Sequence, residues 1–200
     1  ATVLSKLSNF VPEGGIWMNT QRPEWNDANN ALVGNGVSMV TLYYLRRFLQ
    51  FLQHVIENSK SEAVAVSKEL HLFYTQLSGV FSSHSHLLGS SIDNKNRKII
   101  TDALGIAGSN FRNQIYDHGF SGDKENLSLP GLSAFLKTTL RFAEHSIKVN
   151  KRKDNLFNAY NLLSFEKEEL KISYLSEMLE GQVGVLSSEQ LAARESLQLL

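Results

Sequence analysis

Hydrophobic residues recur at intervals of three and four along most of this chain, a spacing that places them on one face of an α-helix. Stripes such as Leu42, Leu45 and Leu49 therefore predict long helices. We expect helices over residues 38–57, 62–81, 94–116 and 129–147, with further helical stretches over residues 178–186 and from residue 189 onward. Ser61 and Ser128 are suited to cap the second and fourth helices, because a serine hydroxyl accepts a hydrogen bond from the first turn.

Two stretches depart from this pattern. Residues 1–36 keep no regular period and are punctuated by glycine and proline. Their aromatic content, including Phe10 and Trp17, predicts an ordered functional loop rather than a disordered tail. Between residues 161 and 175, polar and apolar residues alternate, which favours a small β-hairpin with its turn at Lys167 and Glu168.

Together these elements predict an all-α fold of antiparallel helical hairpins. We expect one helical-hairpin domain over residues 37–200, preceded by the loop of residues 1–36. Gly105 and Gly108 fall inside the third helix, where a glycine costs about 1 kcal/mol relative to alanine. Glycines in such positions often permit close contact between helices.

The composition is that of a globular protein, with 42% hydrophobic residues. Basic and acidic residues number 20 each, so no net charge favours nucleic acid or an anionic membrane, and a neutral substrate fits better. The absence of cysteine excludes disulfides and thiolate metal sites, but leaves open whether the compartment is cytoplasmic or periplasmic. No apolar run reaches the roughly 18 residues of a membrane span.

The segment from Arg22 to Leu32 carries the most informative chemistry. Trp25 offers a flat apolar platform for the C–H face of a sugar ring, and Asn26 offers a planar amide for its hydroxyls. Asp27 supplies a carboxylic acid for the glycosidic oxygen. The competing interpretation is local, because Asp and Asn also favour turns and helix caps without any ligand.

These residues resemble a known family signature. The sequence Glu24-Trp25-Asn26-Asp27, followed by Asn29 or Asn30, is similar to the Trp-Asn-Asp motif of the cellobiose and chitobiose phosphorylases. That family belongs to the (α/α)6-barrel glycoside hydrolases and phosphorylases. The resemblance implies that Asp27 is the general acid and that Trp25 lies beside the acceptor sugar. Glu24 stands where these phosphorylases usually have aspartate, and Arg22-Pro23 is not part of their motif.

The resemblance also implies that the helical hairpins form part of an (α/α)6 toroid, which needs six hairpins and a longer chain. We therefore expect a fragment of a larger catalytic domain. The start at Ala1 and the helical pattern that runs to Leu200 agree with this expectation. Half a toroid would expose apolar helix faces, so the expected partners are the remainder of the same polypeptide or a second copy.

Two reactions are compatible with a carboxylic acid at Asp27. Phosphorolysis needs only this one acid, because inorganic phosphate is the nucleophile and acts as co-substrate; no other cofactor is expected. Hydrolysis needs a second carboxylate to activate water, and Glu24 is the candidate. A neighbouring carboxylate, Glu24 or Glu13, would raise the pKa of Asp27 toward the working pH. Arg22 is suited to bind phosphate or a substrate carboxylate.

Outside this segment the signals are weaker. Glu180 and Gln182 either reach the same cleft from a later hairpin or belong to a solvated helix face. His84 and His86 have no nearby carboxylate or third histidine in the sequence, so we expect no metal site there.

The leading hypothesis is a carbohydrate-active enzyme, a glycoside hydrolase or glycoside phosphorylase, that acts on a disaccharide or oligosaccharide. The first alternative is a noncatalytic helical domain that binds a glycan or a protein. The second is a structural scaffold without a ligand.

Overall fold

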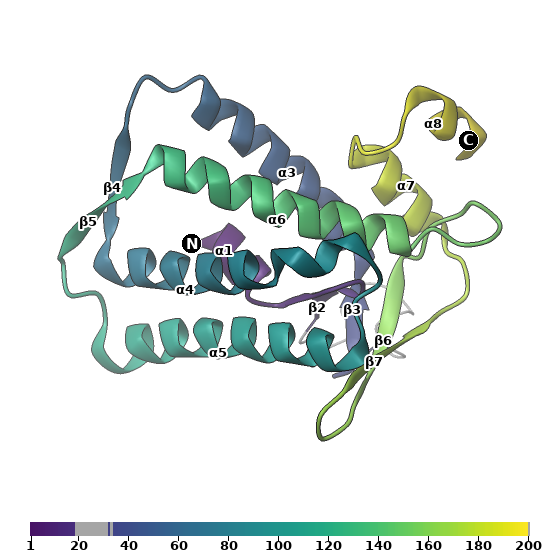
Figure 1. Ribbon diagram of the computed structural model, residues 1–200, viewed down its shortest axis with the longest axis horizontal. Helices are drawn as coiled ribbons and strands as arrows, with labels where there is room; N and C mark the ends of the chain where they lie inside the picture. Colours follow the sequence, from purple (N-terminus) through teal and green to yellow (C-terminus); the bar gives the residue numbers. More distant parts are fainter. Residues whose placement is uncertain (19–31, 33, 200) are drawn as a thin grey trace.

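The protein combines long helices with two antiparallel sheets in a computed structural model that describes residues 1–18, 32 and 34–199. Four long helices lie side by side (Figure 1). They are α3 (Met39–Glu57), α4 (Lys68–His84), α5 (Asn94–His118) and α6 (Leu129–Val149). The shorter helices are α1 (Thr2–Leu7), the 3-10 helix η1 (Ser85–Gly89), α7 (Leu179–Ser187) and α8 (Ala193–Leu199).

The sheets lie at opposite ends of the layer of long helices (Figure 1). At one end is a five-stranded sheet with the strand order β1-β2-β3-β6-β7. Its strands are β1 (Phe10–Val11), β2 (Gly15–Trp17), β3 (Gly36–Ser38), β6 (Tyr160–Phe165) and β7 (Leu170–Tyr174). At the other end, β4 (Ala63–Ser67) and β5 (Lys124–Ser128) form a two-stranded ribbon. Pairs such as Ile16↔Ser38 and Gly36↔Leu162 set the register of the larger sheet.

The expectation of an all-α fold, with helical hairpins forming part of an (α/α)6 toroid, is wrong. The structure is 59% helical, but its curled five-stranded sheet and its second sheet make it a mixed α and β fold. Strands β1, β2 and β3 contain only two or three residues each, too few for a period-two pattern to show in the sequence. The loop expected over residues 1–36 is also incorrect in its first half, which forms α1, β1 and β2.

The helix predictions are confirmed where local signals define both ends. Helix α3 starts after Ser38, whose hydroxyl accepts from the Thr41 N–H at 2.9 Å, and ends at Glu57 as expected. Helix α6 starts after Ser128, with Pro130 in its first turn. Helix α5 begins at Asn94 as predicted and ends two residues later than expected, at His118.

The second predicted helix, residues 62–81, is wrong over its first six residues. Residues 63–67 form strand β4, and the capping serine is Ser67, whose hydroxyl accepts from the Leu70 N–H at 3.3 Å, rather than Ser61. Strand β4 pairs with β5, far along the chain, through contacts such as Ala65↔Asn126. Alternating alanine and valine are compatible with a helix or a strand. The pairing with β5, which is distant in the sequence, stabilises the strand here.

The hairpin expected between residues 161 and 175 is confirmed. Strands β6 and β7 pair antiparallel, and Phe165 opposite Leu170 closes the turn. The hairpin is not an isolated feature, however. Strand β6 also pairs with β3, so the hairpin completes the five-stranded sheet.

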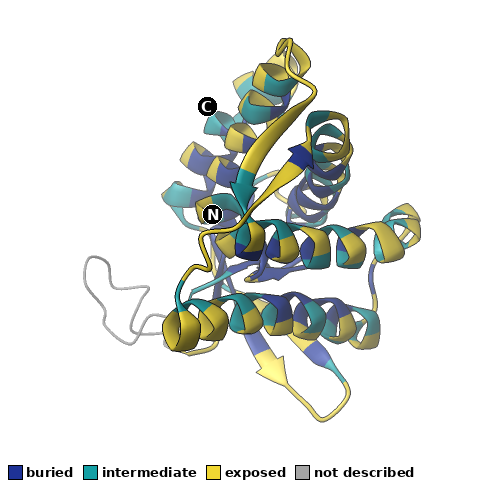
Figure 2. Ribbon diagram, turned by 90° about the vertical axis from the view of Figure 1, so that its left-hand side faces the viewer, coloured by how far each residue is buried: buried dark blue, intermediate teal, exposed yellow. Residues whose placement is uncertain are grey.

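The main hydrophobic core lies between the long helices and the sheet. Phe81 is at its centre, with its ring 5.2 Å from that of Phe142 and 6.0 Å from that of Phe10 on β1. Figure 2 shows buried residues on the inner faces of the helices and exposed residues on their outer faces. The outer face of α3 is more apolar than is usual for a solvated surface, with Tyr44, Phe48, Phe51 and Val55 exposed. The prediction that a partner covers exposed apolar helix faces of this kind stays a prediction.

A buried ion pair fastens the β1–β2 turn to the helices. Glu13 is 2% exposed, and its carboxylate accepts from Arg97 Nη2 at 2.6 Å and from the Ile92 N–H at 2.8 Å. His145 Nε2 on α6 lies 3.0 Å from the other side of the same carboxylate, at Oε1. The backbone of the turn is held as well, because the Glu13 N–H donates to Ser146 Oγ and the Asn150 amide donates to the Glu13 carbonyl.

Glu13 occupies an unusual backbone conformation. Its φ angle is 63°, in the left-handed region, which costs a residue with a side chain about 1–2 kcal/mol. Arg97 offsets this cost by linking the turn to several other segments. It donates from Nε to the Pro12 carbonyl at 3.0 Å and from Nη1 to the Leu170 carbonyl at 3.0 Å. One guanidinium therefore ties helix α5, the β1–β2 turn and strand β7 together.

No helix in the described part of the chain has both the length and the hydropathy of a membrane span.

Replacement of Arg97 by methionine should leave the buried Glu13 carboxylate without its cationic partner. We expect the free energy of unfolding to fall by about 3–5 kcal/mol, the usual range when one side of a buried ion pair is removed. Urea denaturation at pH 7 measures this loss. The matched control is Lys98→Met on the same helix, because Lys98 pairs with the half-exposed Asp102 and such pairs contribute about 0–1 kcal/mol. Equal losses in the two variants would contradict the role assigned to Arg97.

The ion pair should also make the free energy of unfolding depend on pH. Burial alone would raise the pKa of Glu13, but hydrogen bonds from His145, Ile92 and Arg97 outweigh burial and lower the pKa below its ordinary 4.5. The charged carboxylate is therefore favoured in the folded state. Its stabilising contribution is fully present above pH 4.5 and is lost as the pH falls through the lower pKa of the folded protein.

We expect the difference in unfolding midpoint between the unmodified protein and Glu13→Gln to be constant from pH 7 to about pH 5 and to shrink below that. Thermal melts followed by circular dichroism over this pH series measure the difference. A difference that stayed constant down to pH 3 would show that the Glu13 charge is not what stabilises the turn.

Candidate functional site

The segment that carries the predicted catalytic chemistry lies outside the described residues. This applies to Arg22, Glu24, Trp25, Asn26, Asp27, Asn29 and Asn30, whose roles stay predictions. The structure does show where both ends of residues 19–31 are attached. Before the segment, the Met18 N–H donates to the Gly36 carbonyl at 3.1 Å. After it, Leu32 is fully buried against Ala159 and Tyr160. The segment therefore begins and ends beside strands β2 and β3.

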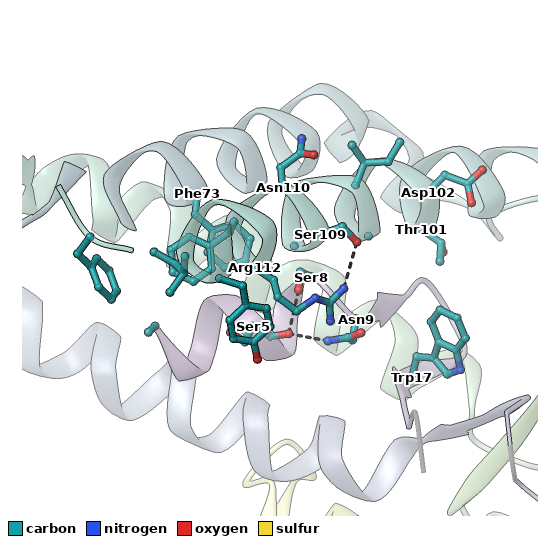
Figure 3. Close-up of a pocket in the computed structure, with 18 of the residues that line it drawn as sticks. Ser5, Ser8, Asn9, Trp17, Phe73, Thr101, Asp102, Ser109, Asn110 and Arg112 are labelled. Atoms are coloured by element: carbon teal, nitrogen blue, oxygen red, sulfur yellow. Dashed lines mark hydrogen bonds between the residues drawn. The ribbon is translucent and has the colours of Figure 1, made fainter. Parts of the chain in front are cut away.

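A groove of about 870 Å³ lies next to this attachment point, between α1, α5 and the ends of strands β2 and β6 (Figure 3). We call it the α1–α5 groove. Its characteristic lining residues are Ser5, Asn9, Trp17, Gly105, Arg112 and Phe165. Both apolar and polar side chains line the groove, which is typical of sites for small organic ligands.

One part of the α1–α5 groove is aromatic. Trp17 stands at the end of β2 and Phe165 at the end of β6, with ring centroids 5.7 Å apart and planes tilted by 44°. The Trp17 indole N–H donates to the Gly34 carbonyl at 3.2 Å, which fixes the orientation of the indole ring. Because β3 lies between β2 and β6 in the sheet, the sheet itself brings these two side chains together.

Another part of the groove is polar. Ser8 and Asn9, at the end of α1, direct their side chains to the Ser5 carbonyl, at 3.0 and 2.8 Å. Arg112 on α5 is exposed and donates from Nη2 to Ser109 Oγ at 3.3 Å (Figure 3). Among the described residues no carboxylate lies within 4.0 Å of the Arg112 guanidinium, so most of its donors are available to a ligand.

Glu13, one of the two carboxylates considered as neighbours of Asp27, lies in the β1–β2 turn, and its effect on the pKa of Asp27 stays a prediction. Its carboxylate is buried and takes hydrogen bonds from Arg97 and Ile92, and it contacts His145. Those contacts lower the pKa of Glu13 and keep it charged. The structure thus gives Glu13 a role in holding the β1–β2 turn.

Gln182, predicted to bind substrate, is held by the protein backbone. Its side-chain amide donates to the Phe157 carbonyl at 2.9 Å and accepts from the Phe157 N–H at 2.9 Å. Gly181 beside it permits this contact, because a Cβ there would lie 2.6 Å from the Phe157 carbonyl oxygen. Glu180, in the first turn of α7, is half-buried. Neither Glu180 nor Gln182 lines the α1–α5 groove, and substrate binding by the two stays a prediction.

The two histidines considered for metal binding contact helix carbonyls. His84 Nδ1 lies 2.8 Å from the Val80 carbonyl, and His86 Nδ1 lies 3.0 Å from the Ser83 carbonyl. Within the described ranges, no group of three or more His, Cys, Asp or Glu side chains is placed to hold a metal ion.

Sequence reasoning did not select the residues that make the α1–α5 groove. The sequence indicated Trp17 only as one aromatic residue of the N-terminal segment, and it indicated Phe165 only as the end of a predicted strand. Gly105 gave the clearest signal, because a glycine inside a long helix calls for an explanation. The close-contact explanation holds for Gly108, where a Cβ would lie 2.6 Å from Ser8 Oγ, but not for Gly105, where a Cβ would meet no atom of the described residues within 4 Å.

Substitution of Gln182 by alanine should destabilise the protein, because the Phe157 N–H and carbonyl would lose their partners in a buried site. We expect the free energy of unfolding to fall by about 1–3 kcal/mol. Val183→Ala is the control, since Val183 is exposed on the same helix and should change stability by less than about 0.5 kcal/mol. Chemical denaturation compares the two. An unchanged stability for Gln182→Ala would contradict the stabilising role assigned to its contacts with Phe157.

Comparison with known proteins does not identify a family for this chain. No family model matches the chain, and no curated protein matches it in sequence. A proposal about function can therefore rest only on the chemistry of the residues between Arg22 and Leu32 and on the geometry of the α1–α5 groove.

Proposed function

We propose that this chain belongs to a carbohydrate-active enzyme that cleaves or phosphorolyses a glycosidic bond, with Asp27 as the general acid. The observation that carries the proposal is the sequence Glu24-Trp25-Asn26-Asp27, which joins a carboxylic acid, an amide and an aromatic platform in consecutive positions. Its similarity to the Trp-Asn-Asp motif of cellobiose and chitobiose phosphorylases supports the same chemistry.

The surroundings of the segment are compatible with a sugar substrate. Residues 19–31 are attached beside the α1–α5 groove, because Trp17 precedes them and also lines that groove. The groove offers an aromatic surface together with hydroxyls, amides and a guanidinium, which are the groups that saccharides need. The balanced charge of the chain also fits a neutral substrate better than a polyanion.

The proposed reaction needs a proton donor on one side of the glycosidic bond and a nucleophile on the other. Asp27 donates its proton to the glycosidic oxygen as the bond to the anomeric carbon breaks. In phosphorolysis, inorganic phosphate attacks the anomeric carbon from the opposite face and yields a sugar 1-phosphate. In hydrolysis, a carboxylate such as Glu24 takes a proton from the attacking water and yields the free sugar.

Asp27→Asn in the full-length protein should lower turnover of a cleaved glycoside by about 10²–10⁴-fold, the usual contribution of a positioned general acid. Cellobiose and chitobiose, each assayed with and without inorganic phosphate, are the first substrates to test. Sugar 1-phosphate formed only with phosphate indicates phosphorolysis, whereas free sugar formed without phosphate indicates hydrolysis.

Asp117→Asn is the control for this experiment, because Asp117 is an exposed carboxylate near the end of α5. It should leave turnover unchanged. If Asp27→Asn were folded and fully active, the assignment of Asp27 as the general acid would be wrong.

A noncatalytic glycan-binding domain is the second candidate, and the α1–α5 groove favours it. The lining residues that the structure describes include the aromatic and polar groups that bind saccharides, so the groove can bind a saccharide even if no bond is cleaved. Binding of an oligosaccharide by the full-length protein, with no turnover in the presence or absence of phosphate, would decide for this candidate.

A further inference from the structure

We infer that the α1–α5 groove is an oligosaccharide subsite, in which a sugar ring stacks on Trp17 and Phe165 and fills the space left open by Gly105. The ligand class rests on the proposed function, whereas the site itself is argued from the described residues alone.

Gly105 is the first observation. It lies in the interior of α5, a 25-residue helix, where glycine is less favourable than alanine. Gly108, one turn later, is needed for packing, because a Cβ there would lie 2.6 Å from Ser8 Oγ and 2.9 Å from Ser8 Cβ. A Cβ at Gly105 would meet no described atom within 4 Å, yet Gly105 lines the groove. Helix packing therefore does not require a glycine here, and the missing side chain leaves this part of the groove open to a ligand.

The aromatic pair is the second observation. Trp17 is held in place by the hydrogen bond from its indole N–H to the Gly34 carbonyl. Phe165, 47% exposed, extends the apolar surface at an angle of 44° to the indole plane. The C–H faces of sugar rings bind to rigid aromatic surfaces of this kind, because the rings lose little freedom on binding. The pair can therefore hold one sugar ring at the sheet end of the groove.

Polar groups in the same groove provide hydrogen bonds for hydroxyls. The Arg112 guanidinium has a single described partner, Ser109 Oγ at 3.3 Å, and Figure 3 shows it beside Ser5, Ser8 and Asn9 of the α1 region. Ser5, Ser8 and Asn9 add hydroxyls and an amide to the lining of the groove. A polyhydroxylated ligand supplies both acceptors and donors to such groups, whereas a purely apolar ligand would leave them unpaired.

The charge of the groove favours a neutral or acidic saccharide over a cationic ligand. Among the described residues that line the groove, the carboxylate is that of Asp102, and Lys98 pairs with it at 2.6 Å. Arg112 has no such counter-charge among the described residues. A cationic ligand would be repelled by this guanidinium, whereas hydroxyl or carboxylate oxygens of a saccharide would accept hydrogen bonds from it.

The test is isothermal titration calorimetry of the full-length protein with four probes: cellotetraose, chitotetraose, maltotetraose and tetragalacturonate. We expect saturable binding of at least one of them. Gly105→Leu should weaken that binding at least about tenfold, because the new side chain fills the groove. Gly79→Leu is the matched control, since Gly79 is also a glycine within a helix that has nothing within 4 Å of an added Cβ, but lies on α4 outside the groove.

Both leucine variants replace a glycine in a helix by a better helix former, so neither is expected to lower the melting temperature. The control should bind within about twofold of the unmodified protein. Trp17→Ala should also weaken binding about tenfold or more, and Phe165→Ala provides the same test if Trp17→Ala does not fold. No binding of any probe, or equal binding by Gly105→Leu and Gly79→Leu, would overturn the inference.

These outcomes also separate the subsite from the proposed reaction. Loss of turnover in Asp27→Asn, with binding that does not respond to Gly105→Leu, would keep the reaction and reject the subsite. Binding that responds to Gly105→Leu, in a protein that turns over no glycoside, would keep the subsite and reject the reaction.

Discussion

The buried pair of Glu13 and Arg97 is the interaction on which the arrangement of sheet and helices depends. Arg97 extends from α5 to the carbonyls of Pro12 and Leu170, and thus reaches both the β1–β2 turn and strand β7 at the far edge of the sheet. Two charged groups are removed from water at this point, which is favourable only because nearly every donor and acceptor has a partner. The same pair indirectly places Trp17, since β2 begins two residues after Glu13.

A set of asparagines continues this polar junction toward the C-terminal half of the chain. The Asn150 side chain accepts from Asn161 at 2.9 Å, and Asn161 shares its amide with the Gly14 carbonyl at 2.8 Å. Strand β6 is thereby connected to the β1–β2 turn through side chains as well as through β3. Such directional contacts select one packing of helices against the sheet, which hydrophobic burial alone would specify less narrowly. That packing therefore determines the shape of the α1–α5 groove.

The sequence was informative where structure is decided locally. Ser128 caps α6 as expected, α3 ends at Glu57 as expected, and the alternation near Ile172 identified a real hairpin. It was not informative where the deciding contact is distant: β4 pairs with β5, and the short strands before residue 40 pair with one another and with β6. The candidate site divides in the same way. The chemistry proposed for Asp27 rests on adjacent residues in the sequence and stays a prediction, whereas Trp17 and Phe165 come together in the groove only through the folded sheet.

The pairing of β3 with β6 has a consequence for the order in which the chain becomes structured. The two strands are far apart in the sequence, at Gly36–Ser38 and Tyr160–Phe165, yet they are adjacent in the sheet through registers such as Val37↔Asn161. During synthesis, β3 emerges long before its partner, so one edge of an incomplete sheet is left with unpaired backbone groups. An uncovered strand edge is a template for pairing with another chain. A ribosome-bound or truncated product that ends before residue 160 would therefore be the form of this protein most prone to aggregate, and chaperones that shield strand edges would act on it in that interval.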